Sequence, residues 1–346
     1  MALQCSGRAP TALRARRGTA PLPLLALALL VLCGGAAAKE VGCRSKFGPY
    51  IEGAAVDKAG NVYAVSWDRK LGSVGKVATA GDGACSAAAA TPANVIGLRV
   101  LPDGSFLGAG FDGKKVVLIK DGATTTFCAD PAMVSPNDLA ISPKTGFVYV
   151  SGQAWKDNNA VGDGDVWLCR GKGAPAVRLA QLGRTNGIEV SADGGWLFVS
   201  ESFNKGGNPV SNVIWRFPIA ADGAIDAAKK ELVIDFEAAD GSGKTDVDGM
   251  RLDAAGRLYV TRHNGAAVVV VDPMGTNKVL ERIPLPFSAP TNLEFGGPDG
   301  KTLYVVGRCG FRTPYGTGDG CIEAIDRPVA GLYWSNLQKG LPKVAV

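Results

Sequence analysis

Histidine is almost absent from this chain of 346 residues, in which His263 is the only one. A single histidine excludes zinc sites built from several imidazoles and argues against a Ser-His-Asp catalytic triad. The eight cysteines show no C-x-x-C spacing, so neither a thiol redox centre nor a cysteine-rich zinc site is supported. A G-x-S-x-G nucleophile elbow is also missing. The sequence therefore disfavours the common histidine- and serine-based hydrolase mechanisms.

Excess positive charge is also small once its location is considered. Lys and Arg number 37 against 32 Asp and Glu, which gives a formal net charge of +5. Four arginines (Arg8, Arg14, Arg16 and Arg17) lie within the first 17 residues. Without that segment the net charge falls to about +1, which removes the electrostatic basis for a nucleic-acid or anionic-membrane partner.

A compact apolar run at residues 21–33 follows this arginine-bearing, acid-free start. Its length of about 13 residues falls short of the roughly 20 that a membrane-spanning helix needs. Ala36 and Ala38 fit an A-x-A cleavage pattern, so residues 1–38 are predicted to be a signal peptide that directs the protein into the secretory pathway or out of the cell. An organelle-targeting presequence and a buried N-terminal helix are the alternatives. We expect residues 39–346 to form a single domain without a membrane span, and to be monomeric.

Cysteine usage agrees with export. Six cysteines remain after residue 38, and an even number in an exported chain predicts disulfides, although six allow 15 pairings. Cys309 and Cys321 flank a short loop rich in Gly and Pro, so we expect these two to pair. The partners of Cys43, Cys85, Cys128 and Cys169 are left open.

One phrase occurs six times along the chain: an apolar start, a turn with Asp, Pro or Gly, and a second run rich in β-branched and aromatic residues. The copies start at Gly53, Gly97, Asp138, Gly187, Gly249 and Asn292, which are 44, 41, 49, 62 and 43 residues apart. Each copy is typical of a β-hairpin, and a period of this length is typical of propeller blades. We predict an all-β fold, a six-bladed β-propeller with four-stranded antiparallel blades around a central channel. His263 ends the second run of the fifth copy, which favours a solvent-side or rim position over catalysis.

The residue just before each copy carries the functional signal. These six positions hold Glu52, Ile96, Asn137, Asn186, Asp248 and Thr291. The innermost strands of a propeller line its channel, so equivalent positions form a ring at one mouth. Two carboxylates and two carboxamides in that ring suit a hard cation, and we predict a Ca²⁺ site at Glu52, Asn137, Asn186 and Asp248, with Mg²⁺, Mn²⁺ or Zn²⁺ as alternatives. Each residue alone is also an ordinary turn residue.

The same stretches resemble the regucalcin/gluconolactonase family. The resemblance rests on residues 50–53 (YIEG), 135–138 (SPND), 185–187 (TNG), 247–250 (VDGM) and 291–305 (TNLEFGGPDGKTLYV). It implies a six-bladed propeller that holds a divalent cation and hydrolyses lactones. It also implies that Glu52, Asn186 and Asp248 bind the metal, that Asp248 is the proton acceptor and donor, and that Asn137 contacts the substrate or the metal's surroundings.

One position departs from the family pattern. Sugar-lactone hydrolases of the family often carry a substrate-holding arginine two residues before this Asn, where the chain has Ser135. We therefore assign Ser135 and Asn137 to substrate binding and expect a less polar lactone, an ester or another small molecule as substrate.

The predicted chemistry also follows from the residues themselves. A cation at the channel mouth polarises a lactone carbonyl, and a carboxylate beside it takes a proton from the attacking water and returns it to the leaving oxygen. We assign that role to Asp248. The alternative is a secreted propeller without catalytic activity that binds a small molecule or a protein and keeps calcium for structure.

Overall fold

The computed structural model describes residues 38–42, 46–67, 73–79, 85–92, 94–309 and 318–346. Residues from Ala36 to Val346 form one compact unit. Apart from Ala38, the predicted signal peptide lies outside the described residues and stays a prediction, as does the boundary of the mature domain. Within the described residues, none of the helices combines the length and hydrophobicity needed to cross a membrane.

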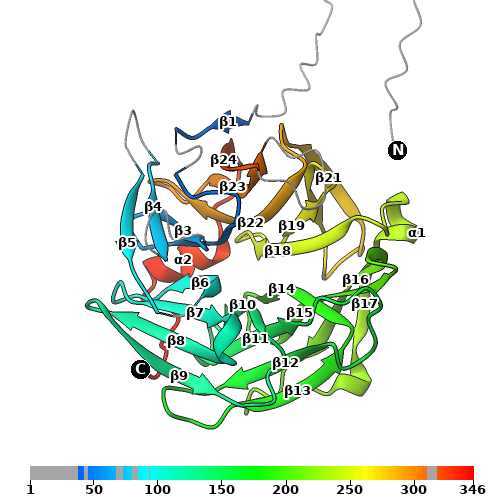
Figure 1. Cartoon of the computed structure of the whole chain (residues 1–346), viewed down its shortest axis with the longest axis horizontal. Helices are drawn as coiled ribbons and strands as arrows, with labels where there is room; N and C mark the ends of the chain where they lie inside the picture. Colours follow the sequence, from blue (N-terminus) through cyan, green and yellow to red (C-terminus); the bar gives the residue numbers. More distant parts are fainter. Residues whose placement is uncertain (1–37, 43–45, 68–72, 80–84, 93, 310–317) are drawn as a thin grey trace, which may run out of the picture. The chain divides into compact units, whose positions relative to one another are not determined.

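Six four-stranded antiparallel sheets are arranged in a ring, which confirms the predicted propeller (Figure 1). The first blade consists of β2 (Ile51–Val56), β3 (Val62–Ser66), β4 (Val74–Val77) and β5 (Ser86–Ala89). The second consists of β6 (Val95–Val100), β7 (Phe106–Gly110), β8 (Lys115–Lys120) and β9 (Ala123–Ala129). The third consists of β10 (Pro136–Ile141), β11 (Val148–Gln153), β12 (Gly164–Cys169) and β13 (Val177–Leu182). The next two consist of β14 (Arg184–Val190), β15 (Trp196–Lys205), β16 (Asn208–Pro218) and β17 (Glu231–Asp235); and β18 (Asp246–Leu252), β19 (Leu258–His263), β20 (Ala267–Val271) and β21 (Val279–Pro284).

The sixth blade joins the two ends of the unit. Its inner strands are β22 (Ala289–Gly296), β23 (Thr302–Cys309) and β24 (Asp319–Asp326), and its outermost strand is β1 (Lys39–Glu40). Lys39 pairs with Ala324 and Glu40 with Glu323. The N-terminal strand thus covers the edge that β24 would otherwise expose, and the ring is closed by strand pairing.

Burial between neighbouring blades holds the ring together. Each repeat alternates apolar side chains along its strands, and the inward-facing ones of adjacent sheets share a core, as Leu107 and Val116 of the second blade do with Leu139 and Trp167 of the third. The first strands of neighbouring blades contact each other around the whole ring. Helices are few: α1 (Phe236–Asp240), α2 (Leu332–Gln338) and the 3₁₀ turns η1 (Phe111–Gly113) and η2 (Ala227–Lys229).

Two disulfides connect described cysteines. Cys309 pairs with Cys321 across β23 and β24, which confirms the pairing expected from the sequence. Cys128 on β9 pairs with Cys169 on β12, so this second disulfide fastens the second blade to the third. Cys85 is disulfide-bonded as well. Cys43 lies outside the described residues.

An ion network of Arg99, Asp138, Glu189, Arg251 and Glu294 fills the interior of the channel, where all five side chains are buried. Arg99 pairs with Glu189 at 3.1 Å and with Glu294 at 3.6 Å. Arg251 pairs with Asp138 at 3.1 Å and with Glu294 at 3.2 Å. Four of the five lie three residues after one of the six positions that precede the repeat copies: Arg99, Glu189, Arg251 and Glu294. They are therefore one layer deeper in the channel than the residues predicted to bind metal.

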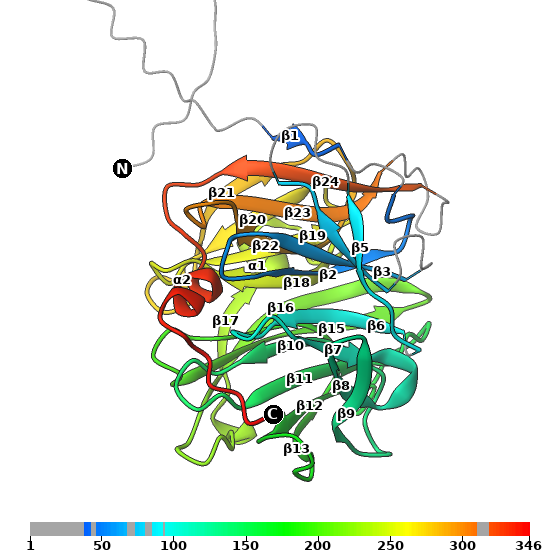
Figure 2. The ribbon, with the colours of Figure 1, turned by 90° about the vertical axis from the view of Figure 1, so that its left-hand side faces the viewer.

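Helix α2 lies at one face of the ring, at the end of the channel that holds this network (Figure 2). The Tyr333 hydroxyl donates a hydrogen bond of 2.8 Å to the carbonyl of Val100, and the guanidinium of Arg99 lies 5.3 Å from the centre of the Tyr333 ring. Network and helix together leave the opposite mouth as the accessible end of the channel.

Removing one acid from the ion network should destabilise the fold strongly. Glu294→Ala leaves Arg99 and Arg251 with one carboxylate each in a buried site, and breaking buried pairs in this way costs about 3–5 kcal/mol. Glu231→Ala, which removes the half-exposed partner of Arg216, should cost about 0–1 kcal/mol. Denaturant unfolding of both variants measures the difference, and equal losses would mean that the network contributes nothing beyond a surface pair.

Candidate functional site

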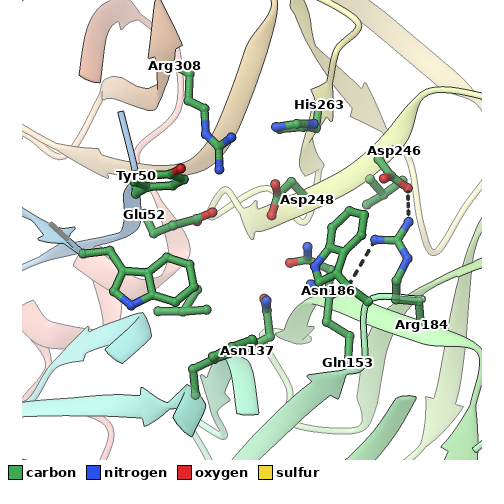
Figure 3. Close-up of a pocket in the computed structure, with 15 residues that line it drawn as sticks. Tyr50, Glu52, Asn137, Gln153, Arg184, Asn186, Asp246, Asp248, His263 and Arg308 are labelled. Carbon is green, nitrogen blue, oxygen red and sulfur yellow. Dashed lines mark hydrogen bonds and ion pairs between the residues drawn. The ribbon is translucent and has the colours of Figure 1, made fainter. Parts of the chain in front are cut away.

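The four side chains predicted to bind metal line one pocket of about 240 Å³. Glu52, Asn137, Asn186 and Asp248 come from β2, β10, β14 and β18, the innermost strands of four different blades. Their polar ends point toward a common space (Figure 3). Ile96 from β6 also lines the pocket. The structure therefore brings the predicted residues together, and we call these four the oxygen ring.

A β-bulge in each inner strand explains why this position faces the channel. The pairing of first and second strands shifts register between Pro136 and Leu139, between Thr185 and Ile188, and at the equivalent place in the other four blades. A bulge leaves extra residues unpaired and re-aims their side chains. The ring residue lies inside this irregularity or, for Glu52, directly beside it.

Glycine after the ring residue allows the inner strands to approach closely. A Cβ atom on Gly187 would lie 2.4 Å from the carbonyl oxygen of Asp248, and one on Gly53 would lie 2.0 Å from that of Ile96. Gly53 also has a φ of +54°, a conformation that other residues rarely adopt. These two glycines therefore let the oxygen ring contract around a small space.

The electrostatics of the oxygen ring disfavour two free carboxylates. Burial raises the pKa of Glu52 well above its usual range, and the nearby Asp248 raises it further. Burial likewise raises the pKa of Asp248, with Asp246 adding to the rise and a hydrogen bond from Asn186 opposing it. A divalent cation between the two groups would remove this cost, because it compensates both negative charges at once.

The donor set fits such a cation. Two carboxylates and two carboxamides are oxygen ligands of the kind that Ca²⁺ and Mg²⁺ accept. Among the described residues, no group of three or more His, Cys, Asp or Glu side chains is placed to hold a metal. The oxygen ring contains only two such residues, so carboxamides and solvent would have to supply the other ligands.

A second ring of side chains surrounds the pocket mouth. Its members occupy the equivalent position in all six repeats, at the end of the second apolar run. They are Trp67, Phe111, Gln153, Ser202, His263 and Arg308. All except Ser202 line the pocket. We call this set the rim ring. Of these side chains, sequence reasoning considered His263 alone, although aligning the six phrases to their last residue would have found them all.

His263 occupies a wall of the pocket and is half-buried. Burial, together with the charges of Arg308 and Arg184, lowers its pKa to about 3, so the imidazole is neutral at physiological pH. The sequence favoured a rim or solvent-side position, and the structure refines this to a rim position that faces the pocket.

Arg184 is the most firmly held cation of the site. Its guanidinium donates hydrogen bonds to Asp246 at 2.6 Å, to Gln153 at 3.1 Å and to Asn204 at 3.1 Å. Trp155, which is 57% exposed, lies over it with a separation of 4.1 Å between guanidinium and ring centre. Arg184 and Asp246 stand two residues before Asn186 and Asp248, so the repeat would have identified both positions, which the sequence analysis missed.

Aromatic side chains form a wall on the side of the first two blades. The Tyr50 and Trp67 rings lie 6.0 Å apart, and the Trp67 and Phe111 rings 5.4 Å apart, both in edge-to-face arrangements. Tyr50 is 44% exposed. The pocket therefore combines a polar floor with an apolar side.

Ser135 is not among the residues that line the pocket. It lies just before β10 with a φ of +30°, and its carbonyl accepts a hydrogen bond from the amide of Gln153. Gln153, rather than Ser135, lines the pocket at this place. The assignment of Ser135 to substrate binding stays a prediction.

Comparison with known protein families agrees with the resemblance described for the short motifs. The family described as SMP-30/Gluconolactonase/LRE-like region matches residues 77–307, which is well over half of the chain. The chain belongs to this family. The resemblance found in the short motifs is thereby confirmed.

Several named relatives match parts of this SMP-30/gluconolactonase-family chain. A 6-deoxy-6-sulfogluconolactonase of Pseudomonas putida is 34% identical over 122 residues, which are 35% of this chain and 37% of that protein. Regucalcin of Xenopus laevis is 42% identical over 62 residues, 18% of this chain and 20% of that protein. A pentonolactonase of Haloferax volcanii is 41% identical over 73 residues, 21% and 22% of the two chains. The matches thus span less than two fifths of each relative.

Solved structures show the same fold. A luciferin-regenerating enzyme superposes with a TM-score of 0.66 at 17% identity and covers 90% of this chain and 100% of that one. A calcium-binding protein, regucalcin, from Agrobacterium tumefaciens superposes with a TM-score of 0.64 at 21% identity and covers 85% and 97%. At sequence identities of 17% and 21%, these superpositions show that the fold is shared and nothing more.

Without a cation, the oxygen ring should reduce stability at neutral pH. Because the pKa of Glu52 is raised in the folded state, the unfolded chain loses its proton first, and stability falls as pH rises above the usual value of 4.5. In the presence of a chelator, Glu52→Gln should therefore be more stable than the wild type at pH 7, by about 1–3 kcal/mol. The gain should vanish below about pH 4, where both states are protonated.

Urea unfolding at both pH values measures this effect. Glu231→Gln, an exposed control, should change stability by less than about 0.5 kcal/mol. A Glu52→Gln variant that is less stable than the wild type at pH 7 would show that the carboxylate is already compensated by its surroundings.

Proposed function

We propose that this protein is a divalent-cation-dependent hydrolase of lactones or related esters, with Ca²⁺ as the favoured cation. The observation that carries the proposal is the oxygen ring, in which two half-buried carboxylates and two buried carboxamides face one space at the open end of the channel. Membership of the SMP-30/gluconolactonase family supports it, as do relatives named as a sulfogluconolactonase, a pentonolactonase and regucalcin.

The cation would be held by Glu52, Asn186 and Asp248, with Asn137 beside them. A divalent cation bound there supplies Lewis-acid polarisation of the substrate carbonyl. Asn137 is buried and points into the same space, so its amide is placed to orient the substrate. The wall of Tyr50, Trp67 and Phe111 shields the reacting bond from bulk water on one side.

Asp248 is the proton carrier in this scheme. Its carboxylate accepts a proton from water as the water oxygen attacks the carbonyl carbon. The same proton then passes to the ring oxygen as the carbon–oxygen bond breaks, which yields the hydroxy acid and restores the carboxylate. Burial and the nearby Asp246 raise the pKa of Asp248 in the cation-free pocket, and a bound cation would oppose that rise. Asp248 would therefore accept the proton through the carboxylate oxygen that does not face the cation.

The pocket favours a substrate with an apolar portion. The aromatic wall provides a surface for it, and the sequence has Ser135 where sugar-lactone hydrolases of the family often have arginine. A small lactone or ester with a ring or chain that packs against Trp67 meets both conditions.

We further propose that the protein acts outside the cytosol. The N-terminal segment has the pattern of a signal peptide, and disulfides such as Cys128–Cys169 and Cys309–Cys321 are typical of oxidising compartments.

Two substitutions separate metal binding from proton transfer. Asn186→Ala removes a neutral ligand, so it should weaken cation affinity and regain activity at high Ca²⁺. Asp248→Asn keeps the size and one oxygen of the side chain but removes the base, so turnover at saturating Ca²⁺ should fall by about 10²- to 10⁴-fold. Rates across a lactone and ester panel, measured after chelation and at increasing Ca²⁺, give both results.

Two outcomes would contradict the proposal. Near-normal turnover of Asp248→Asn at saturating Ca²⁺ would remove Asp248 from the role of base. A wild-type protein that binds Ca²⁺ tightly but hydrolyses no lactone or ester would instead be a binding propeller with a structural cation.

A further inference from the structure

Arg308 extends into the pocket from the end of β23 in the sixth blade, beside Glu52, Asp248 and His263 (Figure 3). It pairs with Ala289 of the innermost strand and with Gly320 of β24. The next residue, Cys309, is bonded to Cys321. The strand end that carries this arginine is therefore fixed by ladder pairing on both sides and by a disulfide.

Within the part of the chain that the structure describes, no salt bridge or side-chain hydrogen bond holds the guanidinium of Arg308, although the charges of Glu52 and Asp248 act on it through space. Its Nε is buried without a hydrogen-bond partner. Its one specific contact is with the ring of Tyr50, whose centre lies 4.8 Å away. Arg184 in the same pocket differs sharply, because Asp246, Gln153 and Asn204 all accept hydrogen bonds from it.

Charge balance shows what the pocket lacks. The carboxylates of Glu52 and Asp248 would be neutralised by one divalent cation, and the charge of Arg184 is neutralised by Asp246. His263 is neutral, because burial lowers its pKa to about 3. Among the charged side chains that line the loaded pocket, Arg308 is therefore the one left without a partner of opposite charge. The ion network of two arginines and three acids lies in the layer below and does not line the pocket. A partly buried charge without a partner is costly unless a ligand supplies the opposite sign.

We propose that Arg308 binds an anionic oxygen group of the substrate, so that the protein acts on lactones or esters that carry a negative charge beside the reacting bond. A guanidinium is suited to this role, because its planar donors bind carboxylate, sulfonate or phosphate oxygens in a bidentate manner. Tyr50 orients the guanidinium from one face and leaves its donors directed into the cavity. The anion site rests on the cation of the proposed function, because without it Glu52 and Asp248 supply the opposite charge to Arg308. It does not rest on the hydrolysis, which only decides whether the anion belongs to a lactone or ester.

Paired substrates test the proposal. The two probes are γ-butyrolactone with a carboxylate on the ring and the same lactone with a carboxamide at that position. In the wild type, kcat/KM should be higher for the carboxylate. In Arg308→Gln the ratio of the two kcat/KM values should fall by about 10- to 100-fold, the range of a hydrogen bond to a charged group. Arg308→Lys should retain part of the preference, since it keeps the charge.

A matched control removes an arginine elsewhere. Arg282, on the outermost strand of the fifth blade, is exposed and does not line the pocket. Arg282→Gln should leave the ratio unchanged. If Arg308→Gln lowers kcat/KM for both probes by the same factor, Arg308 acts on the common transition state, and the proposed anion specificity is wrong.

A binding assay gives a readout that does not depend on catalysis. Trp67 and Trp155 line the pocket, so ligand binding should change tryptophan fluorescence. Cyclopentanone carboxylate, which cannot be hydrolysed, and its carboxamide are titrated into chelated and into Ca²⁺-loaded protein. The wild type should prefer the carboxylate in the loaded state, and Arg308→Gln should reduce that preference by about 10- to 100-fold.

The two assays distinguish failure of this inference from failure of the proposed function. An Arg308-dependent preference for the carboxylate in binding, without hydrolysis of any lactone, would support the anion site and refute the hydrolase. Hydrolysis of lactones with a ratio near one in the wild type would refute the anion site alone. A carboxylate preference that Arg308→Gln leaves intact would place the anion on the cation and also refute it.

Discussion

Two half-buried carboxylates that face each other at the open end of the channel constrain the rest of this structure. Glu52 and Asp248 come from blades that are far apart in sequence, and burial raises the pKa of both. The charge of Asp248 adds to the rise at Glu52, and the charge of Asp246 adds to the rise at Asp248. A fold that tolerates this arrangement has to hold several inner strands rigidly at one distance. The β-bulges, and the glycines that allow carbonyl groups such as that of Asp248 to approach, provide that geometry.

The rigidity comes from layers below and around the oxygen ring. Directly beneath it, Arg251 links Asp138 on β10 to Glu294 on β22, so three of the strands that form the channel are tied through one side chain. Apolar burial between neighbouring sheets and the Cys128–Cys169 disulfide hold the blades in place. The closed lower end means that the oxygen ring is approached from one side, where Arg308 and the aromatic wall lie.

The sixfold sequence repeat made the blades and the oxygen ring predictable from the sequence. The repeat phrase predicted the blades, and its phase predicted that Glu52, Asn137, Asn186 and Asp248 share one space, because equivalent positions in a propeller face its axis. Arg308 was not predicted, because only the position just before each copy was compared between copies, although the rim-ring position recurs at an equally regular place in each copy. Cys128 and Cys169 belong to different blades, and no local spacing links them. The pairing of β1 with β24 depends on a two-residue strand that carries no periodic signal.

The central claim is that the oxygen ring holds a divalent cation, and a crystal structure of the protein grown with Ca²⁺ tests it most directly. The account predicts one ion in the pocket, with oxygens of Glu52, Asn186 and Asp248 at about 2.3–2.6 Å and the remaining ligands from Asn137 or water. A pocket without an ion at saturating Ca²⁺, or an ion bound elsewhere while these side chains stay as they are, would contradict it.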